Sequence, residues 1–134
     1  MRQMRAGLSV SRHNGRMRHA FAHDAVLSMN SDADERAPGA AVTVALCGHW
    51  EHEPPCPLSP HHVHAERVEN DLHVRVLFAT EAENEREVRG RIERALSGQG
   101  EFPVGFTTPW RLLTSRPSDL LRAETDQAER LIQG

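Results

Sequence analysis

The alternation of apolar and polar residues predicts a first strand at residues 41–47. The two sides of this segment differ in character, with Val42, Val44 and Leu46 on one side and Thr43, Ala45 and Cys47 on the other. A period of two residues is typical of a half-buried strand. Four prolines then fall between residues 51 and 60. Because each proline removes a backbone donor and fixes φ, we expect a rigid loop there.

A β-hairpin is predicted next, from His62–Glu69 and Leu72–Ala79 about a turn at Asn70 and Asp71. The preferred register places one charge pair and two apolar pairs opposite each other, which favours it. These pairs are Glu66 with Arg75, Val63 with Phe78, and Ala65 with Val76. A three-residue turn would instead turn His62, His64 and Glu66 toward the apolar face, where unpaired polar groups are costly.

Two amphipathic helices are predicted in the second half of the chain. The sequence Thr80–Glu83 has the residue types of a capping box, and Gly98 is expected to end the helix that follows. Residues 110–115 predict a fourth strand, and Ser118 is expected to cap the last helix. The residues expected to face the sheet are Val88, Ile92, Ala95 and Leu96 in the first helix and Leu121, Ala128, Leu131 and Ile132 in the second.

The first 40 residues show no sustained period and are predicted to be a disordered N-terminal leader. Residues 1–28 contain five arginines and one acidic residue. Two interpretations are open: a basic arm for an acidic partner, or an over-extended reading frame in which Met29 is the true start. The second is preferred because chain termini are commonly unconstrained. Residues 41–134 then form a single α+β domain.

The predicted elements indicate an α+β fold, with a four-stranded, mainly antiparallel sheet and two helices on one face. Their order matches a ferredoxin-like arrangement in which the Pro/Cys/His-rich loop replaces the first helix. The end of the first strand and the start of the second would meet at one edge of the sheet. The open face, with Ala45, Leu77 and Leu113, is expected to form a homodimer, because exposed apolar patches are unfavourable.

Candidate chemistry is concentrated between Cys47 and His64, which contain both cysteines and five of the nine histidines of the chain. Thiolate and imidazole ligands favour zinc first and copper second. The predicted metal ligands are Cys47, His49, His52, Cys56, His61, His62 and His64. Strand geometry alone leaves side chains on the first and second strands about 10 Å apart. A shared site therefore requires the loop to fold back over the sheet edge.

This cluster predicts a small metal-binding protein in a sensing, storage or delivery role. Two alternatives remain: a small-molecule or thiol enzyme with Cys47 or Cys56 reactive, and a metal-free homodimeric interaction module. Residues 29–134 contain eleven arginines and eighteen acidic residues, so a nucleic-acid partner is not expected. No apolar run reaches membrane-spanning length, and no hydrophobic region of a signal peptide follows the first residues. A reducing, cytoplasmic setting is the expectation, in which the cysteines are thiols or ligands.

Overall fold

The computed structural model describes residues 11–13, 16–47, 59–97 and 110–133. Two short 3-10 turns, Ala82–Asn84 and Arg122–Glu124, precede the second and third helices. The helices and strands follow in the order β1 (Ser11–His13), β2 (Arg16–Ser28), α1 (Ala37–Cys47), β3 (His61–Val68), β4 (Asp71–Glu81), α2 (Glu85–Leu96), β5 (Arg111–Ser118) and α3 (Thr125–Gln133).

The sheet is built around β2. This strand pairs with β4 along one side and with β5 along part of the other, while β3 pairs with β4 and the three-residue β1 pairs with the start of β2. Every pairing is antiparallel, and the four long strands lie in the order β5-β2-β4-β3. The predicted α+β class and four-stranded antiparallel sheet are confirmed.

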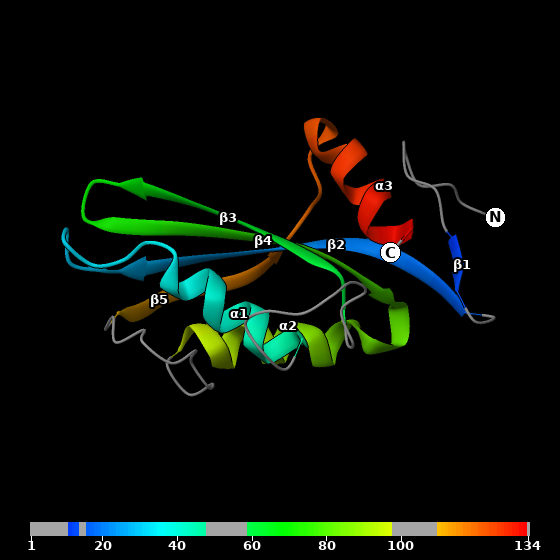
Figure 1. The fold of residues 1–134 in the computed structure, drawn as a ribbon, viewed down its shortest axis with the longest axis horizontal. Coiled ribbons are helices and arrows are strands. Elements are labelled where there is room, and N and C mark those ends of the chain that lie inside the picture. Colours follow the sequence, from blue (N-terminus) through cyan, green and yellow to red (C-terminus); the bar gives the residue numbers. More distant parts are fainter. Residues whose placement is uncertain (1–10, 14–15, 48–58, 98–109, 134) are drawn as a thin grey trace.

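Helices cover both faces of the sheet (Figure 1). α1 and α2 lie on one face, which we call the inner face, and α3 lies on the other, the outer face. The prediction that both helices share one face is therefore wrong for α3. The outer face accepts a helix because β2 and β4 carry small residues there, Ala20, Ala22 and Ala79, against which Ala128 and Ile132 pack.

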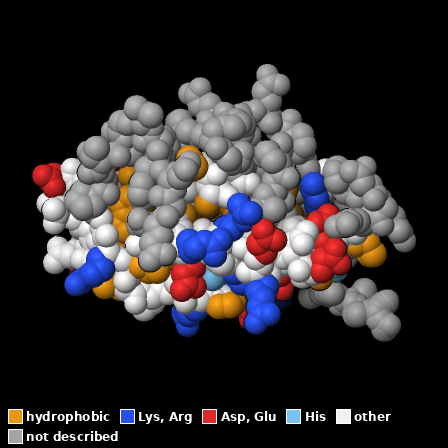
Figure 2. Space-filling view, turned by 90° about the horizontal axis from the view of Figure 1, so that it is seen from below, with side chains coloured by type: hydrophobic (Ala, Val, Ile, Leu, Met, Phe, Trp, Pro, Cys, Tyr) orange, Lys and Arg blue, Asp and Glu red, His pale blue; other side chains and the backbone are white. Residues whose placement is uncertain are grey.

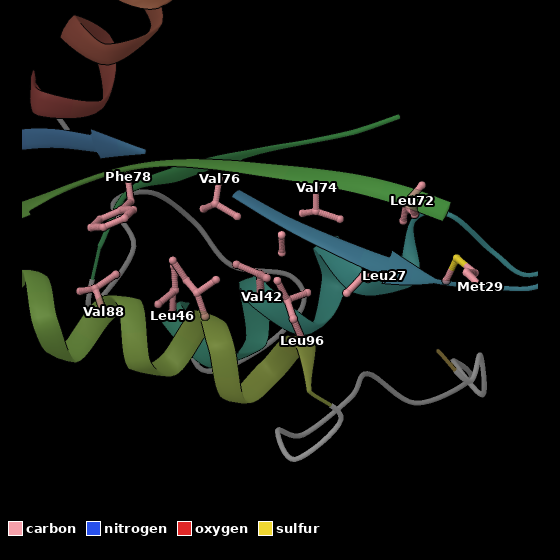
Figure 3. Packing of buried hydrophobic residues seen from close by; sticks show 12 residues of the cluster. Leu27, Met29, Val42, Leu46, Leu72, Val74, Val76, Phe78, Val88 and Leu96 are labelled. Carbon is pink, nitrogen blue, oxygen red and sulfur yellow. The ribbon is translucent and has the colours of Figure 1, made fainter. Parts of the chain in front are cut away.

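The main core lies between the inner face and the two helices that cover it (Figure 3). Side chains of β2 and β4 point toward α1 and α2, and Phe78, Val76, Val74 and Leu72 form a row along β4. The helical side is supplied by Val42 and Leu46 of α1 and by Val88, Ile92 and Leu96 of α2, all buried. The predicted sheet-facing residues of α2 are thereby confirmed.

The predicted strand at residues 41–47 is wrong, because these residues form most of α1. Alanine is the strongest helix former, and four alanines lie between residues 37 and 45. Residues 37, 40, 41, 42 and 46 are buried and lie on several sides of the helix. Because the helix is apolar around most of its circumference, an apparent alternation of apolar residues did not indicate a strand. The elements follow one another as β-α-β-β-α-β from β2 to β5. The ferredoxin-like detail, with a loop in place of the first helix, is not confirmed.

The predicted disorder of the leader is wrong for residues 16–40, which contain β2 and the start of α1. β2 was not predicted because its outer side carries small alanines and because a histidine, His23, interrupts the apolar residues of its inner side between Phe21 and Ala25. Met29 follows the last residue of this strand and is itself buried. A chain beginning at Met29 would lack the strand between β4 and β5.

The hairpin of β3 and β4 is confirmed with a register two residues away from the predicted one. His64 lies opposite Arg75, Val63 opposite Val76 and Ala65 opposite Val74. The turn is therefore made by Glu69 and Asn70. A shift of two residues preserves the two faces, so Val63 and Ala65 remain on the inner face and His62 and His64 on the outer face.

The two predicted helix caps are wrong. β4 continues through Glu81, and the hydroxyl of Thr80 is buried without a hydrogen-bond partner. Ser118 belongs to β5, where its hydroxyl accepts a hydrogen bond from Arg75. Of the predicted sheet-facing residues in the last helix, Ala128, Leu131 and Ile132 are buried, whereas Leu121 precedes the helix and is 58% exposed.

The homodimer surface predicted from the open face also changes. Leu77 is 4% exposed and belongs to the core beneath α3, and Ala45 lies on α1 at the inner side of the sheet. Of the three residues named for that surface, only Leu113 remains exposed, at 45%. α3 thus occupies the surface on which the predicted contact depended.

Starting the chain at Met29 is expected to abolish the fold. The truncation removes all of β2, including the core residues Ala25 and Leu27. The backbone groups of β4 and β5 that pair with β2 then have no counterpart. Thermal unfolding followed by circular dichroism should show a cooperative transition for the full chain and none for residues 29–134. A cooperative transition of similar midpoint in the truncated chain would contradict the position of β2.

Glu69→Gly is expected to stabilise the protein by about 0.5–1 kcal/mol, because Glu69 adopts a φ of 57°, which costs a residue with a Cβ more than glycine. Asn70→Gly is the matched control, since Asn70 has no such φ and the change only adds freedom to the unfolded chain. The measurement is the urea unfolding midpoint of the wild type, Glu69→Gly and Asn70→Gly, and only Glu69→Gly should have a raised midpoint. An equal or larger gain from Asn70→Gly would contradict the turn geometry.

Candidate functional site

His61 is the predicted site residue whose environment is best defined. It is the first residue of β3 and lies on the inner face, where its Nδ1 is 3.0 Å from the carbonyl oxygen of Ser59 and its Nε2 is 3.1 Å from Oγ1 of Thr43. Because a carbonyl can only accept, Nδ1 carries the ring proton and donates it to Ser59. Nε2 is then the nitrogen with a lone pair, and it accepts from the Thr43 hydroxyl.

The carbonyl that orients His61 is itself held firmly. Ser59 is fully buried, and its hydroxyl donates to the carbonyl of Ala79 in β4 at 2.8 Å. The next residue, Pro60, accepts from the amide of Ala79 at 3.0 Å. The start of β3 is thus attached to the far end of β4, and the ring of His61 is held in one orientation.

α1 is held over the start of β3 from two directions. Thr43 contacts His61, and Arg91 of α2 donates to the carbonyl of Ala45 at 3.3 Å. Earlier in the helix, Gly39 lies close to Val63, since a Cβ placed on it would be 3.4 Å from a Val63 methyl carbon. The last turns of α1 and the first residue of β3 therefore lie side by side on the inner side of the sheet.

His62 and His64 lie on the other side of the sheet. Both are exposed on the outer face. In the pairing of β3 with β4, His62 lies opposite Leu77 and His64 opposite Arg75. His62 is near enough to Glu124 to help lower the pKa of that carboxyl, although hydrogen bonds from Arg75 are the larger cause. The orientation of these two histidines is the predicted one, but His61 next to them in the chain faces the opposite way.

The predicted ligand set is therefore divided. Cys47 is the last residue of α1, which covers the inner face, so the prediction that it shares the open face with His62 and His64 is wrong. The reason is that residues 41–47 are helix rather than strand. His49, His52 and Cys56 lie outside the described residues. Within the described ranges, no group of three histidine, cysteine or acidic side chains could hold a metal ion.

A second polar cluster, which the sequence reasoning missed, is buried where α2 meets the sheet. His23 of β2 is 3% exposed. Its Nδ1 accepts from Arg89 at 3.0 Å, and its Nε2 is 2.8 Å from the hydroxyl of Ser115 in β5. Arg89 also donates to the Ala22 carbonyl at 2.7 Å and to Glu85 at 2.8 Å. The sequence signal for this cluster is that His23 takes the place of an apolar residue in the alternation of Phe21, Ala25 and Leu27.

The hydrogen bonds of His23 support a structural role for this cluster and do not activate Ser115 as a nucleophile. Because Arg89 occupies Nδ1, the proton of His23 resides on Nε2 and is donated to Ser115. His23 consequently cannot accept the hydroxyl proton of Ser115, as a general base in a serine nucleophile would. The guanidinium of Arg89 also lies 5.7 Å and 5.2 Å from the ring centroids of Phe21 and Phe78, which fixes α2 against β2 and β4.

A third cluster, centred on Arg75, joins α3 to the outer face. Arg75 forms a bidentate pair with Glu124, at 2.6 Å and 2.8 Å, and also donates to Asp24 and to the carbonyl of Asp119. These hydrogen bonds lower the pKa of Glu124 and raise the pKa of Arg75. With Ser118 as a further acceptor, every donor direction of the guanidinium is used, so Arg75 has none left for a ligand.

The inner-side surface carries charges of both signs among the described residues. Figure 2 shows basic and acidic side chains interspersed across this face. Two ion pairs spaced four residues apart on α2 account for part of the pattern, Glu85 with Arg89 and Glu87 with Arg91.

Comparison with known proteins leaves the chain without a family assignment. No protein-family model and no curated protein matches it. Among the described residues, no helix is both long enough and apolar enough to cross a membrane.

His23 is expected to make stability fall as the solution becomes acidic. Burial, and after it the Arg89 cation, lower the pKa of His23 from 6.5 to about 4, while Asp24 opposes the change. Between these pH values the unfolded chain binds a proton that the folded chain does not. Stability should therefore decrease from pH 6.5 to 4, by at most about 1.4 kcal/mol per unit from this residue.

The measurement is the urea unfolding free energy at several pH values for the wild type, His23→Asn and His73→Asn. His23→Asn should be less stable at neutral pH but should have a flatter slope between pH 6.5 and 4. His73, an exposed histidine of β4, serves as the control and should leave the slope unchanged. Identical slopes in all three proteins would contradict the assignment of this proton uptake to His23.

Proposed function

We propose that the protein binds a zinc or copper ion on the inner side of the sheet, next to the end of α1, in a sensing, storage or delivery role. The proposed donors are Cys47, His49, His52, Cys56 and His61. His62 and His64, which face the outer side, are left out of this set. Thiolate with imidazole is the donor combination that these two metals prefer in proteins.

The orientation of His61 is the observation that carries the proposal. Histidines that ligate metals almost always donate the proton of their other ring nitrogen to a carbonyl, a carboxylate or water, which fixes the ring and its tautomer. His61 has this arrangement, with Nδ1 donating to Ser59 and Nε2 free of a proton. The hydroxyl of Thr43 is the group that Nε2 contacts, and a metal would replace this hydrogen bond.

The position of α1 supports the proposal further. A strand at residues 41–47 would have separated Cys47 from the histidines of β3 by an intervening strand. As the last residue of α1, Cys47 instead follows Thr43 by four residues, which is about one helical turn. The Thr43–His61 contact brings that part of the helix next to the start of β3, so the end of α1 and His61 lie on the same side of the sheet.

Elemental analysis of purified protein without a histidine tag tests the proposal. The wild type should contain close to one zinc or copper per chain, with both thiols protected from an aromatic disulfide reagent until a chelator is added. His61→Ala should lower the metal content at least about tenfold, because the loss even of a residue that only orients a ligand commonly costs that much in metal affinity. His62→Ala, next in the chain but on the outer face, is the matched control and should retain the metal.

Because His61 also contacts α1, its loss could act through folding. Circular dichroism of each variant therefore accompanies the metal analysis, and Cys56→Ser provides a second substitution that is independent of the Thr43 contact. Two equally reactive thiols and no metal in the wild type, even after reconstitution with Zn²⁺ or Cu⁺ under reducing conditions, would overturn the proposal. One thiol labelled much faster than the other would favour the thiol-enzyme alternative.

A further inference from the structure

β3 forms a border of the sheet, since it pairs with β4 and no other described strand pairs with it. The amide of Ala79 donates to the carbonyl of Pro60, which defines the pair 60 and 79 as hydrogen-bonded. Hydrogen-bonded pairs alternate along an antiparallel ladder, so residues 62, 64, 66 and 68 also point their backbone groups toward β4. Val63 and Ala65 direct theirs outward, and no described residue pairs with them.

This border carries few of the devices that commonly protect an edge strand from pairing, the exceptions being the charges of Glu66 and of the inward-pointing Arg67. Such devices include lysine, proline, bulges and very short strands. β3 has eight residues, contains neither proline nor lysine, and keeps one register with β4 throughout. The border also leaves the main core incompletely covered, because Val63 and Ala65 pack against that core yet are only half-buried. An added strand would cover both.

We propose that the occupant of this border is a second copy of the same chain, paired antiparallel through β3. A two-fold axis perpendicular to the sheet at His64 places His62 opposite Glu66 of the second copy. The same axis places Val63 opposite Ala65 of the second copy on the inner face. It also places His61 opposite Arg67 and His64 opposite the same residue of the second copy. Each favourable pair occurs twice, as an isologous interface requires. This self-complementary order of side chains favours a second copy over an unrelated strand.

Two substitutions isolate the contact. Ala65→Pro removes an outward-facing amide and leaves the hydrogen bonds to β4 in place, which is the position where an edge strand tolerates proline. Glu66→Lys replaces the hydrogen-bond acceptor opposite His62 of the second copy with a cationic donor. Glu93→Lys, an exposed change of the same charge on α2, is the control, and His62→Glu combined with Glu66→Lys restores opposite charges.

Sedimentation equilibrium and light scattering from micromolar to near-millimolar concentration give the readout. The wild type and Glu93→Lys should be dimers at the upper end of this range. Ala65→Pro should be monomeric with an unchanged circular dichroism spectrum, and Glu66→Lys should weaken association by about tenfold or more. The double variant should regain association, which a variant that merely misfolds would not do.

A wild type that stays monomeric throughout the range would overturn the proposal. So would a dimer that tolerates both Ala65→Pro and Glu66→Lys. Dissociation caused instead by Leu113→Asp, which alters the exposed apolar residue of β5, would place the contact on β5 and would equally overturn it. None of the residues substituted in these experiments is a proposed metal donor.

Discussion

The antiparallel pairing of β2 with both β4 and β5 is the constraint on which the rest of the structure depends. β2 is thirteen residues long, and it contributes side chains to the cores on both faces of the sheet. Its inner side directs Leu27 toward α1 and α2, and its outer side offers Ala20 and Ala22 to α3. Without β2, the hairpin of β3 and β4 would have no connection to β5.

The polar interactions that reach across the sheet follow from this central position. On the inner face, Arg89 reaches His23 and the carbonyl of Ala22, which attaches α2 to β2. On the outer face, Arg75 bridges Asp24 of β2 and Glu124, which precedes α3. All the donors of Arg75 are used within its network, and both arginines hold a helix against the sheet. The end of α1 lies beside His61, through the contact of Thr43 with that ring.

The sequence predicted most accurately the elements whose apolar period is undisturbed. β4 and α2 have long, regular sets of large apolar residues, and both were placed to within a few residues, although the predicted cap of α2 was wrong. The faces of β3 followed from pairing rules, although its register was two residues off because Glu69 adopts a left-handed turn conformation that its residue type does not suggest. α1 and β2 were missed for physical reasons: α1 is apolar on most sides, and β2 combines small alanines with a buried histidine. Among the candidate site residues, the opposite orientations of His61 and His62 follow from strand alternation, whereas the Thr43 contact depends on a helix that alternation concealed.

The most direct test of the central strand is amide hydrogen exchange of the full chain, resolved by residue. A strand paired on both sides should contain amides that exchange only on global unfolding. The account predicts that the β2 amides between Ala22 and Leu27 exchange as slowly as those of β4, and that their protection matches the free energy of unfolding. If they exchange at the rate of an unstructured peptide while β4 remains protected, β2 is not the centre of the sheet, and the placement of α1 beside His61 loses its basis.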